Sequence, residues 1–226
     1  MGDATWLLNT ESNKEIHMRH VQFWTGLSVT VATLGGTAFA EVRTGSRLPV
    51  DAATLPRECR QFLEIPANAL ADWPFWAGRL SVAACRQGSI AIAPVTDPEK
   101  LRGTIAALEH AVEPSVAIYK DAMANGPIQI RMLAAYWLGM TYTNVAIRAR
   151  AAIPTGGDIM SDLTLADRYL TLHRTIEPLL ANERALALAA FEEGVRLADS
   201  DPTRATGNQM MSNVTASVRA AVAGLH

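Results

Sequence analysis

The chain has 226 residues, of which 49% are hydrophobic and 19% are charged, and its formal net charge is −2. This composition is sufficient for a compact hydrophobic core and gives no sign of disorder. It argues against nucleic-acid binding, because a phosphate-binding surface needs clustered Lys and Arg, whereas the basic residues here are spread singly along the sequence.

The N-terminal segment has the pattern of a removable export signal. A short basic region at 18–20 precedes an apolar stretch over 21–36, and Ala38 and Ala40 provide small residues at the two positions that a signal peptidase inspects. We therefore expect residues 1–40 to be an N-terminal extension and signal peptide, cleaved after Ala40, and the product to be periplasmic or secreted. The alternative is an uncleaved helix, which would be the chain's only membrane contact.

Two cysteines, Cys59 and Cys85, follow the expected cleavage site. An even number of cysteines in an oxidising compartment favours a disulfide between them. The sequence lacks the Cys-x-x-Cys pair of a redox site, and neither cysteine has a histidine within four residues that would suggest zinc. We therefore expect a structural disulfide and no cofactor.

Apolar periodicity and turn residues predict a tether at 41–55 and a single helical domain over 56–224. The expected helices cover 56–64, 73–86, 97–125, 127–152, 161–180, 183–199 and 208–224. Pro114 is expected to kink or divide its helix, and Pro178 is expected to kink the end of its helix. The apolar run 88–94 has no second strand to pair with, so we interpret it as a loop packed on the core. Short connections predict antiparallel helical hairpins, and the fold class is all-α.

Local signals define the ends of the central helices. Asp97 and Pro98 form a typical helix start, and Gly126 is suited to end the same helix before the next one begins. The helix at 127–152 carries two apolar stripes rather than one. We therefore expect it to lie in the middle of the bundle, with neighbours on both flanks.

That central helix contains Leu138-Gly139-x-x-Tyr142, which resembles the first-helix signature of tetratricopeptide repeats, where Gly lets the partner helix approach and Tyr fills the gap beside it. Other residues fit the same repeat loosely: Tyr119, Ala122, Pro127, Ala187, Phe191 and Gly194. The stretch 127–139 is also similar to HEAT repeats. The whole mature chain looks similar to exported bacterial proteins of uncharacterised function that have an early cysteine pair. These resemblances imply a TPR-like helical fold and no particular activity.

The central helix also carries a candidate binding surface, formed by Arg131, Tyr142, Asn144 and Arg148. Such side chains can line a concave surface for a peptide or an acidic ligand. In a more ordinary interpretation, the arginine stems cover apolar surface and their heads cap carbonyls or pair with acids. We predict an exported binding or scaffolding module of the cell envelope, whose partner is another envelope protein or a peptide. A purely structural domain of a membrane complex is a further alternative.

The second hypothesis is a small helical-bundle metal-binding protein or enzyme. Glu109, His110 and Glu113 lie within about one turn of one helix, and His173 and Glu177 are four residues apart on another. Two such helices that face one another can offer several metal ligands. However, the Glu-x-x-His order of a di-metal bundle is reversed here and its further glutamate-bearing helices are missing. Solvated charges on the helix surface are the competing interpretation, and the sequence favours a protein without enzymatic activity.

Overall fold

The computed structural model describes residues 55, 57, 59–60, 72–88, 90, 92–153 and 163–225. The chain divides into two compact units, Met1–Thr44 and Gly45–His226, and all described residues belong to the second. The predicted signal peptide with Ala38 and Ala40, nearly all of the tether, and most of the helix expected at 56–64 lie outside the described residues. The described residues form helices and no strand, which confirms the predicted all-α class.

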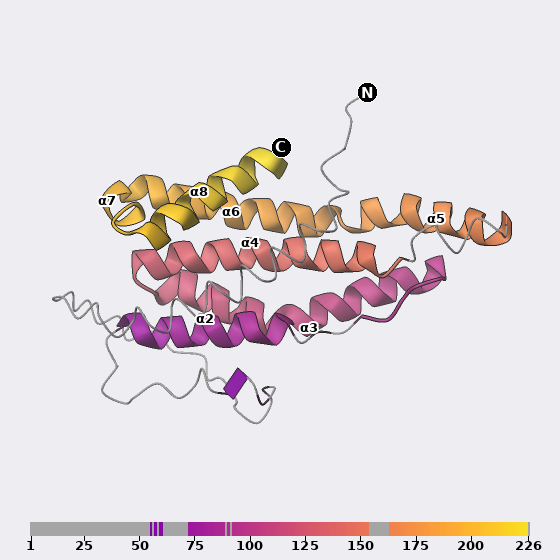
Figure 1. Ribbon diagram of the computed structural model, residues 1–226, viewed down its shortest axis with the longest axis horizontal. Coiled ribbons are helices and arrows are strands. Elements are labelled where there is room, and N and C mark those ends of the chain that lie inside the picture. The colour runs from indigo at the N-terminus through magenta and orange to yellow at the C-terminus, as the bar shows by residue number, and fades with distance from the viewer. Residues whose placement is uncertain are drawn as a thin grey trace. The chain divides into compact units, whose positions relative to one another are not determined.

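The helices, labelled in Figure 1, are α2 (Asp72–Gly88), α3 (Pro98–Asn125), α4 (Ile128–Ala151), α5 (Leu163–Leu179), α6 (Ala181–Ser200), α7 (Pro202–Ala205) and α8 (Gln209–Leu225). Their bounds agree with the predicted ranges to within about two residues, except that the short α7 was not predicted. Its N-cap residue is Asp201, whose side chain accepts a hydrogen bond from the backbone amide of Arg204. Asp201 therefore caps a new turn at the point where the sequence predicts only the end of a helix.

The predicted ends of α3 are confirmed. The side chain of Asp97 accepts a hydrogen bond from the backbone amide of Glu99 at 3.0 Å, and Pro98 occupies the first turn. At the other end, the backbone amide of Gly126 bonds to the carbonyl of Ala122 at 2.9 Å. Pro114 lies inside α3 and does not divide it.

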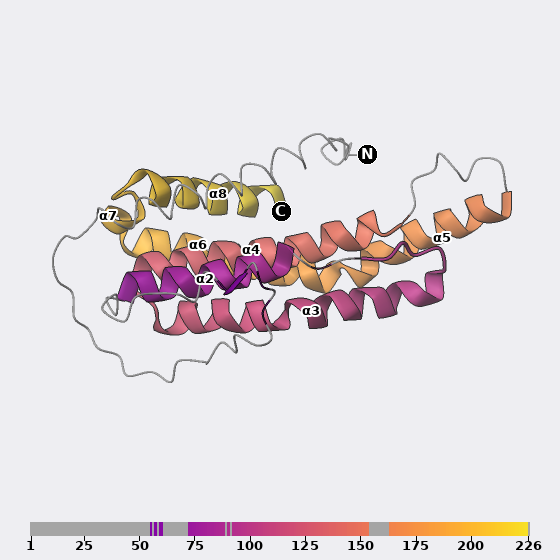
Figure 2. The ribbon, with the colours of Figure 1, turned by 60° about the horizontal axis from the view of Figure 1, so that its bottom comes forward.

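Helix α4 lies at the centre of the bundle, as its two apolar stripes predict. It packs against α3 and α6 most extensively and also against α2 and α8 (Figure 2). Its buried residues lie on most sides of the helix and include Ile130, Met132, Leu133, Ala134, Ala135, Trp137, Leu138, Thr141 and Val145. Ile147, on the remaining side, is 37% exposed. A helix that is apolar on more than one side is normally covered there by neighbouring helices.

The expected hairpin between α5 and α6 is absent from the described chain, because these two helices follow one another end to end (Figures 1 and 2). The backbone amide of Leu180 bonds to the carbonyl of Ile176 at 3.0 Å, and that of Arg184 bonds to Leu180 at 3.1 Å. Helical hydrogen bonding therefore continues across the junction. Pro178 removes one donor from this ladder, which is too little to reverse the chain direction.

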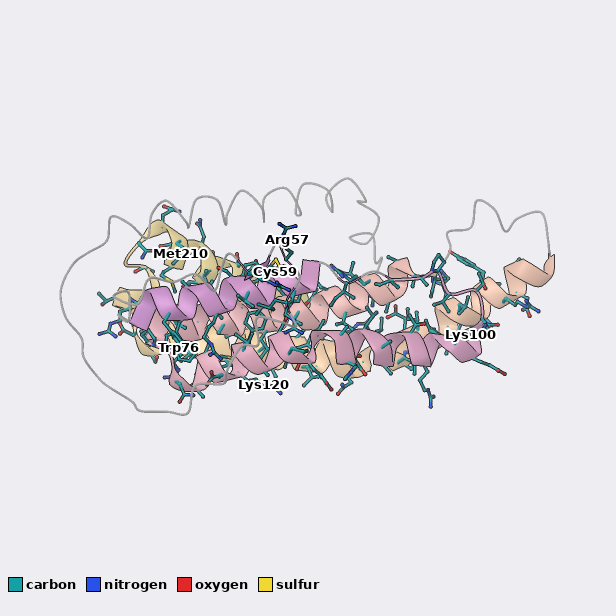
Figure 3. All side chains as sticks on the ribbon, turned by 90° about the horizontal axis from the view of Figure 1, so that it is seen from below. Arg57, Cys59, Trp76, Lys100, Lys120 and Met210 are labelled. Atoms are coloured by element: carbon teal, nitrogen blue, oxygen red, sulfur yellow. A yellow bond between two sulfur atoms is a disulfide. The ribbon has the colours of Figure 1, made fainter. Side chains whose placement is uncertain are left out.

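The predicted disulfide joins Cys59 to Cys85 of α2, with 5.7 Å between their Cα atoms (Figure 3). Helix α2 is also held to α3 by buried polar contacts. The guanidinium of Arg79 donates to the Asp121 carboxylate at 2.9 Å, and the Ser115 hydroxyl donates to the carbonyl of Ala83 at 2.9 Å. These contacts fix α2 against the C-terminal half of α3.

The loop after α2 packs on the core in its described part. Ile90 and Ile92 lie against the apolar cluster formed by α3, α4 and α5, and the backbone amide of Val95 bonds to the carbonyl of Ala152 at 2.7 Å. This agrees with the predicted loop. Within the described ranges, no helix combines the length and the apolarity that a bilayer-spanning segment requires.

Candidate functional site

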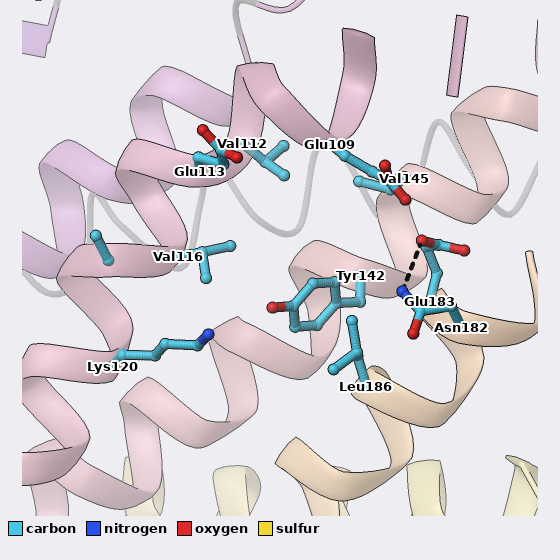
Figure 4. A pocket seen from close by; sticks show the side chains of 11 residues that line it. Glu109, Val112, Glu113, Val116, Lys120, Tyr142, Val145, Asn182, Glu183 and Leu186 are labelled. Carbon is cyan, nitrogen blue, oxygen red and sulfur yellow. Dashed lines mark hydrogen bonds between the residues drawn. The ribbon is translucent and has the colours of Figure 1, made fainter. Parts of the chain in front are cut away.

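A groove of about 420 Å³ lies between α3, α4 and α6 (Figure 4). Helix α4 packs against both α3 and α6, and these two helices make little contact with one another, so α4 forms the floor of the groove. Its lining residues are Glu109, Val112, Glu113, Val116, Ala117 and Lys120 from α3, Tyr142 and Val145 from α4, and Asn182, Glu183 and Leu186 from α6.

The α3 wall is one face of the helix. Its lining residues recur at intervals of three and four from Glu109 to Lys120, which is the spacing that places side chains in a single stripe. The stripe changes character along its length, since carboxylates stand near one end, valines follow, and Lys120 stands at the other end (Figure 4). The groove therefore has an acidic end, an apolar middle and a basic end.

Glu183 is the most unusual residue in the groove. It is only 1% exposed, although it carries a carboxylate. Its Oε1 atom accepts a hydrogen bond of 3.4 Å from the Asn182 side-chain amide. Its Oε2 atom is buried and has no hydrogen-bond donor within the described part of the chain. Burying a polar atom without a partner costs roughly 1–3 kcal/mol, and more for a charged group.

The carboxyl group of Glu109 points toward Glu183 (Figure 4). Two ionised carboxylates have no donor between them, so a hydrogen bond between these side chains requires a proton on one of the two groups. The hydrogen bond to Glu183, partial burial and repulsion by the Glu183 charge together raise the pKa of Glu109 from its ordinary 4.5 to about 7.

Glu183 lies in the first turn of α6, and Glu109 lies in the middle of α3. The two carboxyls therefore face one another from different helices.

Tyr142 forms the aromatic part of the groove floor, next to the acidic pair. Burial is the main cause that raises the pKa of its hydroxyl, and the negative charge of Glu183 raises it further. The hydroxyl is therefore protonated at neutral pH. Val112, Val145 and Leu186 provide apolar surface around it. The site thus combines two carboxyls, a hydroxyl and an apolar wall.

Of the four residues predicted as a binding surface, Tyr142 lines this groove and the others do not. The side chain of Arg131 donates to the carbonyl of Met123 at 2.9 Å, and that of Arg148 donates to the carbonyl of Ile90 at 2.8 Å. Asn144 is partly buried elsewhere on α4. The two arginines therefore cap carbonyls, as the more ordinary interpretation expects.

The geometry gives the metal hypothesis no support. His110 lies 2.9 Å from Glu113 on the same exposed face of α3. Glu177 forms ion pairs with Arg150 and Arg184, and the hydrogen bond from Arg150 is the main cause that lowers its pKa. Among the described residues, no three His, Cys, Asp or Glu side chains are grouped so that they could hold a metal ion.

The sequence analysis missed Glu183, although one signal was available. On α6 and its N-cap residue, Leu180, the residues that recur at helical spacing and become buried are Leu180, Glu183, Ala187, Phe191 and Gly194. A single charged residue in an otherwise apolar stripe indicates a buried ionisable group, and such groups concentrate at functional sites. No local sequence pattern indicates that Glu183 lies close to Glu109, which is 74 positions earlier in the sequence.

Comparisons with known proteins do not assign the chain to a group: no family model, curated protein or solved structure matches it. Helical content alone does not identify a repeat family, so the resemblance to tetratricopeptide or HEAT repeats stays a prediction.

Proposed function

We propose that this chain is an exported binding module of the cell envelope, and that its ligand occupies the groove between α3, α4 and α6. The observation that carries the proposal is Glu183, a carboxylate that is 1% exposed, lines the groove and has one oxygen without a donor in the described chain. Replacing a buried ionic group with an apolar residue of similar volume is often neutral or stabilising. The carboxylate at this position of the groove therefore points to a role in binding rather than in stability.

The export part of the proposal rests on the sequence. The pattern at 18–40 is typical of a signal peptide, and the bond between Cys59 and Cys85 fits an oxidising compartment. Neither observation depends on the groove. The two parts of the proposal therefore need separate experiments.

Export is tested by expressing the full chain with a C-terminal tag in a Gram-negative bacterium and separating periplasm from cytoplasm. We expect periplasmic protein whose N-terminal sequence begins at Glu41. Ala40→Arg should block cleavage, whereas Phe39→Leu, at a position that the peptidase does not inspect, should leave it unchanged. Tagged protein that remains in the cytoplasm at full length contradicts the export part.

Binding in the groove is tested by NMR titration of the full chain, as isolated from the expressing cells, with hexylamine, hexanoate and hexanol. We expect at least one of the three to shift amides of the groove-lining residues. Leu186→Arg should abolish those shifts, because the long charged side chain fills the groove. Leu170→Arg is the matched control: Leu170 is 50% exposed on α5 and does not line the groove. If none of the three probes shifts a groove amide, the groove is not a ligand site.

A further inference from the structure

We propose that the α3 wall of the groove is a self-association surface, on which a second copy of this chain lays its own α3 in the opposite direction. The proposal goes beyond the function proposed above and does not depend on it, because it concerns the exposed rim of the groove rather than a ligand inside it. The residues that carry it all line the groove: Glu113, Val116, Ala117 and Lys120.

These residues form one stripe along α3, which is called the α3 stripe below. Counted from Glu113, they stand at positions i, i+3, i+4 and i+7, so they share one face of the helix (Figure 4). Val116 is half-buried, and the other three are exposed. Spacing of this kind is what one helix presents when another packs against it, and the α3 stripe is open to such a contact.

The two ends of the α3 stripe carry opposite charges. At one end, the side chain of Glu113 is 68% exposed, and its Oε2 atom lies 2.9 Å from Nδ1 of His110. The other oxygen of this carboxylate can accept a hydrogen bond from a further donor. At the other end, Lys120 forms no ion pair within the described part of the chain. The two ends are about 10 Å apart along the helix axis, too far for Glu113 to pair with Lys120 of the same copy.

A stripe with opposite charges at its ends is complementary to itself about a two-fold axis. In a symmetric dimer, when residue i of one copy contacts residue j of the other, residue j also contacts residue i. If the two α3 helices run antiparallel, an axis between Val116 and Ala117 brings Glu113 of each copy opposite Lys120 of the other. The same surface then provides two ion pairs and, between them, an apolar contact.

Other features of the chain favour a second copy as the occupant. Ala117, beside the axis, has a small side chain, which lets two helices approach closely. Leu186, on the opposite wall of the groove, is 37% exposed, and a helix that lies over the groove also covers it. The formal net charge is only −2, so two copies repel one another weakly. Burial of apolar surface provides affinity, and the ion pairs set the register.

Sedimentation equilibrium of the full chain, as isolated from the expressing cells, measures self-association. We expect a dimer with a dissociation constant of roughly 10–100 μM, because a contact of about two helical turns is small for a protein interface. Glu113→Lys and Lys120→Glu should each weaken the dimer by about tenfold or more, since each places like charges opposite one another twice. Arg174→Glu is the matched control for Lys120→Glu: Arg174 is exposed on α5 and does not line the groove.

Exchanging the two charges distinguishes this dimer from unspecific association. The double variant with Glu113→Lys and Lys120→Glu should recover wild-type self-association, because both ion pairs return with their signs exchanged. An equimolar mixture of the two single variants should form a heterodimer, since one α3 stripe is then entirely positive and the other entirely negative. A role in the stability of the single chain would produce neither result. Circular dichroism should show wild-type helix content for every variant.

The two-fold axis also predicts which position meets its own counterpart. Ala117→Cys should form a disulfide-linked dimer with oxidised glutathione as the oxidant, because the two introduced thiols lie beside the axis. Ala106→Cys is the matched control. Ala106 is exposed on the same helix, but eleven residues from Ala117, so the two copies of this position lie far apart. Gel electrophoresis without reductant separates the linked dimer from the single chain.

Three outcomes overturn the inference: a chain that stays monomeric up to about 1 mM, a dimer that neither charge reversal weakens, or a double variant that does not recover self-association. If the chain is monomeric and a small probe shifts the groove amides, the self-association surface is wrong while the proposed function stands. If the dimer forms through the α3 stripe and no probe shifts a groove amide, the inference stands and the proposed function fails.

Discussion

Gly139 of α4 lies directly against the aromatic ring of Phe191 on α6: a β-carbon added at Gly139 would stand only 2.5 to 2.7 Å from three of the ring carbons. The two helices approach closely because Gly139 has no side chain. The Leu138-Gly139-x-x-Tyr142 pattern predicted this role for the glycine. The same close approach holds α6 in the position from which Glu183 reaches the groove.

Replacing Gly139 with alanine should destabilise the protein by about 1–3 kcal/mol, because Phe191 is buried and has little room to move. Urea denaturation followed by circular dichroism measures this difference. Gly103→Ala is the matched control, since a β-carbon at Gly103 has nothing within 4 Å. It should stabilise α3 by up to about 1 kcal/mol. Equal stability of the Gly139→Ala variant and the wild type contradicts the observed packing.

Breaking the buried ion pair between Arg79 and Asp121 should destabilise the protein far more than breaking an ion pair on the surface. Its side chains are 7% and 4% exposed, and Asp121 also accepts a hydrogen bond from Asn125. Asp121→Asn takes the buried carboxylate away from Arg79 and should cost roughly 3–5 kcal/mol. Asp199→Asn, which breaks the exposed pair with Arg219, should cost less than about 1 kcal/mol. If the unfolding curves of Asp121→Asn and Asp199→Asn coincide, the buried pair matters no more to stability than the exposed pair, and the prediction is wrong.

Removing the disulfide should lower the free energy of unfolding by roughly 3.5 kcal/mol on the chain-entropy model, because the bond closes a loop with a sequence separation of 26. The variant to compare is Cys59→Ala with Cys85→Ala. A reducing agent should destabilise the wild type to a similar extent and have no effect on the variant. A wild type whose unfolding midpoint is insensitive to reductant would show that the bond does not stabilise the fold.

The acidic pair should make stability depend on pH between about 4.5 and 7. Since the folded state raises the pKa of Glu109, it binds the proton more tightly than the unfolded state does. The stabilising contribution is therefore complete below about 4.5 and is lost as the pH rises through about 7. In the Glu109→Gln variant, the glutamine side-chain amide can donate a hydrogen bond to Glu183 at every pH. This variant should therefore keep its stability as the pH rises.

Melting temperatures of the wild type and the Glu109→Gln variant, measured from pH 4 to 9, test this prediction. The advantage of the variant should grow across the window from 4.5 to 7 and then level off. Glu113→Gln should follow the wild type in parallel. Parallel curves for all three proteins would mean that Glu109 and Glu183 do not share a proton.

The sequence alone predicted the parts of the fold that depend on neighbouring residues. Apolar periodicity gave the helices, and Asp97, Pro98 and Gly126 gave the ends of α3, because a helix cap involves only the residues beside it. The count and context of the cysteines gave the bond between Cys59 and Cys85. These signals depend on neighbouring residues or on composition, so they can be recognised in the sequence without knowledge of the tertiary structure.

Only the tertiary structure decided how the helices combine and what they bring together. Whether Pro178 bends or reverses the chain depends on the packing of α5 against α3 and of α6 against α4, which no local pattern encodes. The groove exists because α4 separates α3 from α6. Glu109 and Glu183 face one another across it from distant parts of the sequence. The pKa of Glu109 is raised by its hydrogen bond to Glu183, by burial and by the Glu183 charge, and all three depend on distance in space rather than along the chain.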